Sequence, residues 1–266
     1  MTHELSGGHG EGTPGQALTV TVEACERGGI AYHNDRRSAF QGVFRRLVAA
    51  DPRARGTILD IGCGAKVNPV VSDIYTAAAV VHGIDPVEGV LTNEALALGG
   101  RWHGELESAS LPDTFYDMAI AYNVVEHVRD PAGFLTTAYK TLRPGATLWL
   151  LTPNATHPFC RLSRAIELAG LKPVFASRNP SVNDYPAYYR LNDRRSVSRH
   201  AKAAGFTAAR FVYVPCMQWD QYFPAWLRWG PRLYDAVVGL RVPSAMQIMI
   251  CQLTKADRHS AALKAD

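Results

Sequence analysis

Two glycines and two acidic residues have the spacing in this chain that most clearly predicts chemistry. Asp60, Gly62 and Gly64 close a short apolar run, and a second apolar run ends at Asp85, 23 residues after Gly62. Glycines let a backbone approach a ligand without a Cβ in the way, and a carboxylate at a strand end can accept both hydroxyls of a ribose. Strand, glycine turn, helix, strand and acid together predict a nucleotide site in a doubly wound sheet.

Departures from the dinucleotide fingerprint G-x-G-x-x-G indicate which nucleotide binds. Val67 stands where a third glycine would allow close helix packing. Asp60 would repel a pyrophosphate, whereas it suits a ligand that carries an ammonium group. S-adenosylmethionine has a ribose, an adenine and an amino-acid tail but no phosphate, so the pattern favours it over NAD. A plain strand-to-helix turn is the competing interpretation of this motif taken alone.

Further motifs follow in order along the chain. They are LDIGCG at 59–64, GIDP at 83–86, LPDTFYD at 111–117, NVVEHV at 123–128, LRPG at 142–145 and LTPN at 151–154. In this order and spacing the chain resembles the class I S-adenosylmethionine-dependent methyltransferases, in particular the broad group that acts on small molecules. The resemblance covers residues 37 to 154 and weakens beyond them, where such enzymes diverge to fit their substrates. Lys66 departs from it, because the glycine turn is often uncharged in the family.

The resemblance implies a set of cofactor contacts. Gly62 and Gly64 should pass under the methionine part and the ribose. Asp60 should help to hold the ammonium, directly or through water, and Asp85 should take the ribose hydroxyls. The positions that would contact adenine and the methionine part, after the third and fourth strands, are Glu105 with Leu106, and Asn123. The five cysteines show no Cys/His spacing typical of zinc, so no metal is predicted.

Two histidines are candidate general bases. The methyl group of a sulfonium is transferred by in-line displacement, so the enzyme must align the reactants and, for an oxygen acceptor, remove a proton. His127 and His157 each follow a strand whose end should border the site, and the pKa of histidine lies near the working pH. A structural role for His127 competes with this one, since a Glu-His pair recurs here across the family whatever the acceptor.

Candidate contacts to the acceptor lie outside the regular strand–helix alternation. They are Tyr32, His33, Tyr188, Tyr189, Arg190 and Trp219. Two insertions, near 154–192 and 215–243, are expected to form a substrate cap, and the aromatic residues of the second suggest a ring-bearing acceptor. Packing of these aromatics onto the core, a homodimer face and a surface that touches lipid remain competing interpretations.

Alternating apolar runs predict the fold. Strands are expected near 57–61, 80–84, 101–104, 117–122, 146–152, 206–214 and 246–254, with helices between them. The alternation predicts an α/β fold, a doubly wound and mostly parallel seven-stranded sheet with a helical or irregular substrate cap. From the resemblance, the last strand should pair antiparallel.

Domain boundaries follow from composition. Residues 1–16 are expected to be a disordered tail, and 257–266 a second tail. Residues 17–55 should form an N-terminal helical lid that begins with a short strand or helix, and 56–256 the methyltransferase domain. No apolar run approaches the roughly 20 residues that cross a bilayer, and no secretory pattern is present, which predicts a cytoplasmic protein.

Charge and composition limit the alternatives. The net charge of +4 is too small to indicate nucleic acid, and the basic residues between Arg190 and Lys202 read as the solvated face of a helix. The preferred function is a small-molecule methyltransferase, with oxygen as acceptor slightly ahead of nitrogen. High Ala, Gly and Arg content associates it with bacterial secondary metabolism and antibiotic biosynthesis. An RNA methyltransferase, a lipid or quinone methyltransferase at a membrane surface and a non-catalytic cofactor-binding protein are the alternatives.

Overall fold

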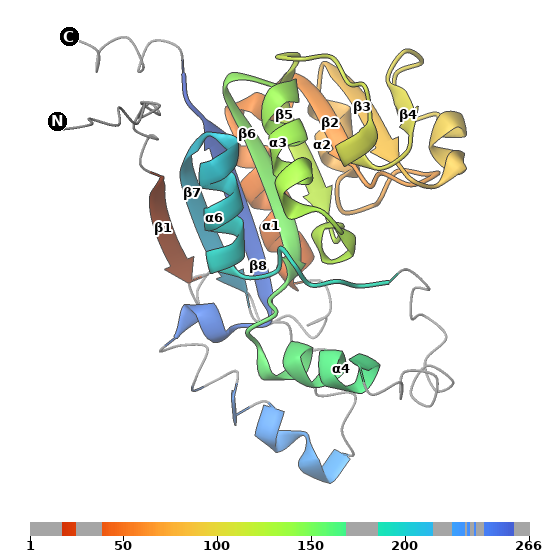
Figure 1. Cartoon of the computed structure of the whole chain (residues 1–266). Helices are drawn as coiled ribbons and strands as arrows, with labels where there is room; N and C mark the ends of the chain where they lie inside the picture. Colours follow the sequence, from red (N-terminus) through yellow and green to blue (C-terminus); the bar gives the residue numbers. More distant parts are fainter. Residues whose placement is uncertain are drawn as a thin grey trace, which may run out of the picture.

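Eight strands form one mixed sheet in the computed structural model (Figure 1). The structure describes residues 18–24, 39–168, 186–214, 225–231, 233–234, 237 and 242–257. The strands lie in the order β1-β7-β8-β6-β5-β2-β3-β4. Their bounds are β1 Thr19–Ala24, β2 Thr57–Ile61, β3 Val80–Asp85, β4 Arg101–His103, β5 Tyr116–Tyr122, β6 Leu142–Pro153, β7 Phe206–Val214 and β8 Ile248–Lys255.

Strand directions confirm the doubly wound prediction. β8 pairs antiparallel with β6 and β7, and the other pairs are parallel. All seven expected strands are present, and β1 is one more than predicted. The alternation of Thr and Val in Thr19–Ala24 suits a strand, and β1 pairs with β7 at one edge of the sheet. The open choice between strand and helix at the start of residues 17–55 is therefore decided in favour of a strand.

The LRPG segment is part of a strand. Leu142 already pairs with Tyr116, and regular pairing resumes between Thr147 and Met118. Gly145 between them has a φ of +77°, which suits glycine because it has no Cβ. The LRPG segment is therefore an irregular start of β6, which begins four residues before the expected position 146.

Helices cover both faces of the sheet. The α-helices whose bounds are defined are α1 Ala39–Ala50, α2 Ser72–Ala77, α3 Pro131–Thr141, α4 Pro158–Leu168 and α6 Arg194–Ala204. Short 3-10 turns are η1 Pro52–Arg55, η2 Glu88–Thr92, η3 Leu106–Ser108, η4 Val125–His127, η6 Ala225–Leu227 and η7 Pro243–Ala245. Figure 1 shows α3 and α6 on one face of the sheet and α1 and α2 on the other. Among the described residues, no helix has the length and apolar character that crossing a bilayer requires.

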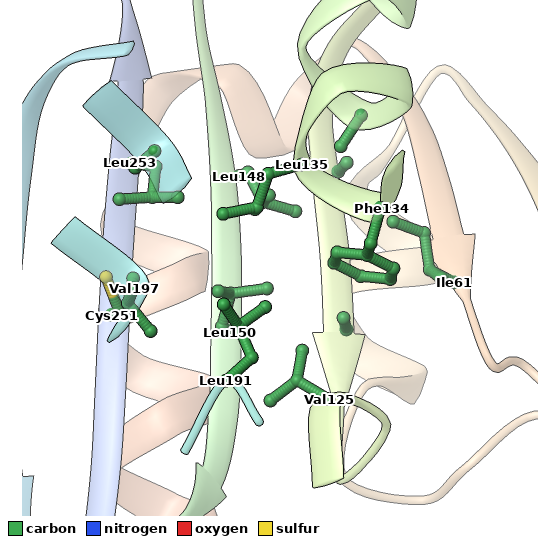
Figure 2. Close-up of a cluster of buried hydrophobic side chains, with 14 of the residues drawn as sticks. Ile61, Val125, Phe134, Leu135, Leu148, Leu150, Leu191, Val197, Cys251 and Leu253 are labelled. Atoms are coloured by element: carbon green, nitrogen blue, oxygen red, sulfur yellow. The ribbon is translucent and has the colours of Figure 1, made fainter. Parts of the chain in front are cut away.

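The core on the α3 and α6 face is closely packed. Phe134 and Leu135 of α3 and Val197 of α6 point toward the sheet (Figure 2). The sheet residues in the same cluster include Ile61, Leu148, Leu150, Cys251 and Leu253. Each fully buried aliphatic or aromatic side chain contributes roughly 1.5–3 kcal/mol. This packing holds α3 and α6 against the sheet.

The basic residues of α6 face solvent, as predicted. Arg194, Arg195 and Arg199 are exposed, whereas Val197 and Ala201 are buried. The Asp193 carboxylate accepts a hydrogen bond from the Ser196 N–H at 2.9 Å, which caps the first turn. An amphipathic surface helix therefore accounts for this basic cluster.

Helix α1 belongs to the core on the opposite face. Phe44 and Val48 are fully buried, and the Phe44 ring lies 5.5 Å from the ring of Tyr122 in β5. This part of the segment expected to be a lid packs against the sheet. Residues 25–38 of that segment, which include Tyr32 and His33, lie outside the described residues.

Asp51, between α1 and η1, joins several elements through one buried carboxylate. Its Oδ2 accepts hydrogen bonds from Thr147 Oγ1 at 2.9 Å, Trp149 Nε1 at 3.0 Å and Gln252 Nε2 at 3.0 Å. Burial alone would raise the pKa of Asp51, but these donors, with the backbone and charge of Arg53, outweigh it and lower that pKa. The carboxylate thus ties the end of α1 to β6 and β8.

Candidate active site

A cleft of about 300 Å³ opens beyond the carboxyl ends of β2, β3 and β5. Its floor includes Gly62 after β2 and Gly104 after β4. Apolar side chains form much of its wall, namely Ile61, Ile84, Leu106, Val124, Val128 and Phe134. Open α/β sheets bind ligands at this edge, so the position agrees with the predicted nucleotide site.

The glycine turn requires glycine for two reasons. Gly62 and Gly64 have φ values of +78° and +65°, a region that other residues rarely adopt. A Cβ on Gly62 would also lie 2.2 Å from Val124 Cγ2. Lys66, the departure from the family pattern, is exposed. The turn therefore brings bare backbone to the cleft.

Asp85 fastens this turn to the end of β3. Its Oδ2 accepts a hydrogen bond from the Gly64 N–H at 2.8 Å, and its Oδ1 accepts one from the Val87 N–H at 2.7 Å. Asn93 donates from Nδ2 to the Gly64 carbonyl at 3.1 Å, which holds the turn from the other side. Each carboxylate oxygen can accept a further hydrogen bond, so Asp85 retains the capacity to bind hydroxyl groups.

Asp60 is a buried acid behind the same turn. Its side chain is 4% exposed, and burial raises its pKa from 3.8 to about 7. A hydrogen bond from Tyr75 opposes this shift in the pKa, and the charge of Asp85 adds to it. A nearby cation would favour the ionised form of such a carboxyl. Asp60 is therefore suited to a ligand that carries a positive charge.

The remaining predicted cofactor residues lie at the ends of β4 and β5. Glu105 and Leu106 both border the cleft, with Leu106 buried and Glu105 exposed. Asn123 has a φ of +54°, and its N–H donates to the Leu151 carbonyl at 2.9 Å. It thereby ends β5 and sets the course of Val124, which does border the cleft. The described residues thus combine a glycine turn, two acids and an apolar wall, and this set fits an adenosine with a charged tail.

Comparison with known proteins identifies the family. A family model described as a methyltransferase domain matches residues 32–210. The chain belongs to the class I S-adenosylmethionine-dependent methyltransferases. Its cofactor is accordingly S-adenosylmethionine.

Several named methyltransferases are similar to this one. The chain is 32% identical over 139 residues to a ubiquinone biosynthesis O-methyltransferase of Methylobacterium sp. (strain 4-46), a match that covers 48% of this chain and 52% of the relative. The chain thus spans about half the length of the curated relatives it matches. An S-adenosylmethionine-dependent methyltransferase structure from Mesorhizobium loti matches with a TM-score of 0.51 at 16% identity, over 80% of this chain and 96% of that one. This structural likeness shows the fold.

His127 borders the cleft of this methyltransferase. It ends η4, and its Nδ1 lies 3.0 Å from the Pro186 carbonyl oxygen. A carbonyl only accepts hydrogen bonds, so Nδ1 carries the hydrogen and Nε2 is the nitrogen that could take up a proton. The bond also holds Pro186, itself a wall residue, at the cleft.

Tyr188 is the predicted acceptor contact that the structure places in the cleft wall. Its hydroxyl accepts hydrogen bonds from Arg129 Nε at 3.2 Å and Nη2 at 2.9 Å. The guanidinium carbons of Arg129 and Arg190 lie 5.4 Å and 5.6 Å from its ring centroid. Arg129 also borders the cleft, and no sequence pattern had indicated it.

Tyr189 and Arg190 support Tyr188. Tyr189 has a φ of +52°, and its N–H and that of Tyr188 both donate to the Glu126 carbonyl, at 3.1 Å and 2.7 Å. Arg190 donates from Nη1 to the Arg129 carbonyl at 2.7 Å. These bonds fix residues 186–190 against η4 at the edge of the cleft.

His157 lies at the start of α4. It is fully buried, its Nδ1 accepts a hydrogen bond from the Phe159 N–H at 3.2 Å, and its ring packs edge-on at 5.4 Å from Tyr234. It is not among the residues that line the cleft. A catalytic role for it stays a prediction, as does the role of Trp219, which lies outside the described residues.

Glu126 is a buried acid that links β6 to the segment after residue 186. Burial raises its pKa. Its Oε2 accepts a hydrogen bond from Thr152 Oγ1 at 3.2 Å, and Asn192 Nδ2 donates to the same hydroxyl at 2.5 Å. The Glu of the Glu-His pair thus has structural contacts, whereas the His faces the cleft.

Proposed function

We propose that this methyltransferase moves a methyl group from S-adenosylmethionine to an oxygen of a small, ring-bearing molecule. The observation that carries the proposal is the glycine turn, whose Gly62 borders a cleft that is also lined by His127, with the buried acids Asp60 and Asp85 next to the turn. The names of the curated relatives, O-methyltransferases, support oxygen as the acceptor atom. On composition alone, we place the reaction in bacterial secondary metabolism and in the cytoplasm.

Each residue has a role in this proposal. Asp85 would accept the ribose hydroxyls, Asp60 would hold the ammonium, and Glu105 with Leu106 would contact adenine. The glycine turn lets backbone approach the tail and the ribose. When bound, S-adenosylmethionine supplies a methyl group already activated by a sulfonium. The protein must then align the acceptor with that methyl group and exclude water.

Of the two candidate histidines, His127 and His157, we prefer His127 as the proton acceptor. An acceptor hydroxyl becomes a better nucleophile when a base near the working pH removes its proton. His127 lies in the cleft wall, and its Nδ1 donates a hydrogen bond to the Pro186 carbonyl, so a proton taken up by the ring would go to Nε2. His157 supports the start of α4 instead.

A labelled methyl group tests this function. Purified protein would be incubated with S-adenosylmethionine labelled in the methyl group and with bacterial extract, which is then divided into small-molecule, lipid, RNA and protein fractions. We expect label in the small-molecule fraction, bound to oxygen in the isolated product. Label in RNA alone, or label on nitrogen alone, would contradict the proposal.

A lipid or quinone acceptor at a membrane surface is a second candidate, favoured by one observation. Trp226, Trp229 and Leu233 are 74%, 64% and 54% exposed. Trp226 lies in η6, and Trp229 and Leu233 lie in helical residues that follow a turn at Arg228. Exposed tryptophan and leucine side chains are typical of segments that lie in a membrane interface.

A further inference from the structure

Tyr75 lies next to Asp60, one of the residues proposed to bind the cofactor. It belongs to α2, and its half-buried ring packs against the apolar clusters around Ile74 and around Cys63. Its hydroxyl donates a hydrogen bond to Asp60 Oδ2 at 2.5 Å. The helix after the glycine turn thus contacts the acid that precedes the turn.

The groups around Asp60 explain why this contact matters. The titratable groups that interact with it are Tyr75 from α2, Cys63 in the glycine turn and Asp85 at the end of β3. None of these three carries a positive charge. Burial and the charge of Asp85 favour the neutral form of Asp60, whereas the hydrogen bond from Tyr75 favours the carboxylate.

We propose that Tyr75 is a positioning residue for the cofactor, which holds Asp60 ionised and turned so that Oδ1 is left for the ammonium group. This inference rests on the proposed contact between Asp60 and that ammonium. The ring of Tyr75 is fixed by packing on both sides, so its hydroxyl supplies a donor of defined position. A tyrosine hydroxyl stays protonated at neutral pH, and burial raises the pKa of Tyr75 further, so it remains a donor.

The consequence for binding is a dependence on pH. A carboxyl that must ionise before it pairs with a cation binds that cation more weakly below its pKa, and Asp60 has a pKa of about 7. Loss of the Tyr75 hydroxyl should raise the pKa of Asp60 above that value. More of the protein would then hold a neutral Asp60 at pH 7.5, and the cofactor would bind less tightly.

Tyr75→Phe keeps the ring and removes the hydroxyl. Binding of S-adenosylhomocysteine would be measured by calorimetry between pH 5.5 and 7.5, where its amino group stays mostly protonated. For the unmodified protein we expect affinity to rise with pH and to level off near pH 7. For Tyr75→Phe we expect roughly tenfold weaker binding at pH 7.5, with affinity still rising there, since a hydrogen bond to a charged group is lost.

Two controls separate positioning from a general loss of structure. 5′-methylthioadenosine has the adenosine part without the amino-acid tail, so its binding should not change in Tyr75→Phe. Tyr116→Phe removes a buried hydroxyl that contacts His82 at 3.1 Å, away from Asp60, and should leave the pH profile unchanged. On an Asp60→Asn background, Tyr75→Phe should have little further effect. Should Tyr75→Phe fail to fold, Tyr75→Met carries the same expectations.

Other results would overturn the inference. An unchanged pH profile for S-adenosylhomocysteine in Tyr75→Phe would show that the hydroxyl does not hold Asp60. Equal weakening for methylthioadenosine would show a merely structural role. If the unmodified protein bound both ligands without any dependence on pH or on Asp60, the proposed ammonium contact itself would fail, and the cofactor assignment would still stand.

Discussion

Asp85 accepts two backbone hydrogen bonds that hold the glycine turn, and in the proposed function it also accepts the ribose hydroxyls. Asp85→Ala removes these bonds together with the contacts to the ribose. We expect the affinity for S-adenosylhomocysteine to fall by about 100-fold or more, since at least two hydrogen bonds to a charged group are lost. Calorimetry measures the affinity. Asp85→Asn, which keeps one acceptor oxygen, should be intermediate, and normal binding by Asp85→Ala would contradict the site.

His127 can be tested as a base separately from its bond to Pro186. In His127→Asn the side-chain amide can still donate to the Pro186 carbonyl, but the titratable nitrogen is gone. We expect kcat to fall by about 10²–10⁴, as for loss of a general base. The KM for the cofactor should change little. Near-normal kcat in His127→Asn, with a loss in His127→Ala alone, would assign His127 to holding Pro186.

Asp60 should destabilise the protein when no cofactor is bound. Its pKa is raised in the folded state, so the folded protein binds more protons than the unfolded one between about pH 4 and pH 7. Its contribution to stability therefore falls as pH rises through that range and stays unfavourable above it. We expect Asp60→Asn to raise the thermal midpoint at pH 8 without ligand, while weakening binding of S-adenosylhomocysteine. A lower midpoint would contradict the burial argument.

The predictable part of the site lies in one strand–turn–helix–strand unit. Gly62, Gly64 and Asp85 follow or end strands of this unit, and their spacing along the sequence is typical of a nucleotide site. Tyr75 and Arg129 were not indicated, because their contacts arise from how α2 and the segment after Pro186 pack onto the sheet. The same holds for His157, whose burial at the start of α4 depends on tertiary packing.

At the scale of elements, Asp51 should control how α1, β6 and β8 hold together. Its folded pKa is lowered, so its contribution to stability is present above its unfolded pKa, near 3.8, and is lost as pH falls through the folded value. We expect Asp51→Asn to lose about 1–3 kcal/mol of unfolding free energy at pH 7, because hydrogen bonds to a charge are weakened. Urea unfolding at pH 7 and pH 3 measures this loss.

A matched variant and the pH comparison make the Asp51 prediction specific. Asp113→Asn changes an exposed carboxylate and should leave the unfolding free energy nearly unchanged. The difference between Asp51→Asn and the unmodified protein should shrink at pH 3. An equal difference at both pH values would assign the effect to packing rather than to the charge of Asp51.

Elements with strong apolar patterns were predicted, and irregular ones were not. Most of the seven expected strands consist largely of buried residues, which explains why they were recognised, whereas β4 has no buried residue. β1 is an edge strand with exposed Thr19, Val20 and Thr21, so its pattern did not distinguish strand from helix. β6 starts earlier than expected because Leu142 already pairs with Tyr116, ahead of the irregularity that contains Gly145 with its positive φ.

At the scale of the molecule, the cleft, α4 and the helical residues after Ala225 lie toward the same edge of the sheet. Figure 1 shows α4 and the light-blue helical residues after Ala225 beyond the end of β6. That these later insertions form a cap and recognise the acceptor stays a prediction. The identity of the acceptor was not predictable, because no local motif encodes contacts made by segments far apart in the sequence.

The exposed side chains of Trp226, Trp229 and Leu233 permit a test of membrane contact. If they dock on lipid, the protein should sediment with anionic phosphatidylglycerol vesicles, and Trp226→Ala with Trp229→Ala should abolish most of that binding. Leu98→Ala removes a side chain that is 89% exposed and lies in a different segment, so it is the matched control. No sedimentation of the unmodified protein would favour an acceptor dissolved in water.

A crystal structure of the complex with S-adenosylhomocysteine would show directly whether this cleft and its neighbouring acids bind the cofactor. We expect the ligand in the cleft beyond β2, β3 and β5, with the ribose hydroxyls on Asp85 and the adenine beside Leu106. The ammonium should lie on the side of Asp60 away from Tyr75, directly or through one water. A ligand bound elsewhere, or a ribose that makes no contact with Asp85, would contradict the account.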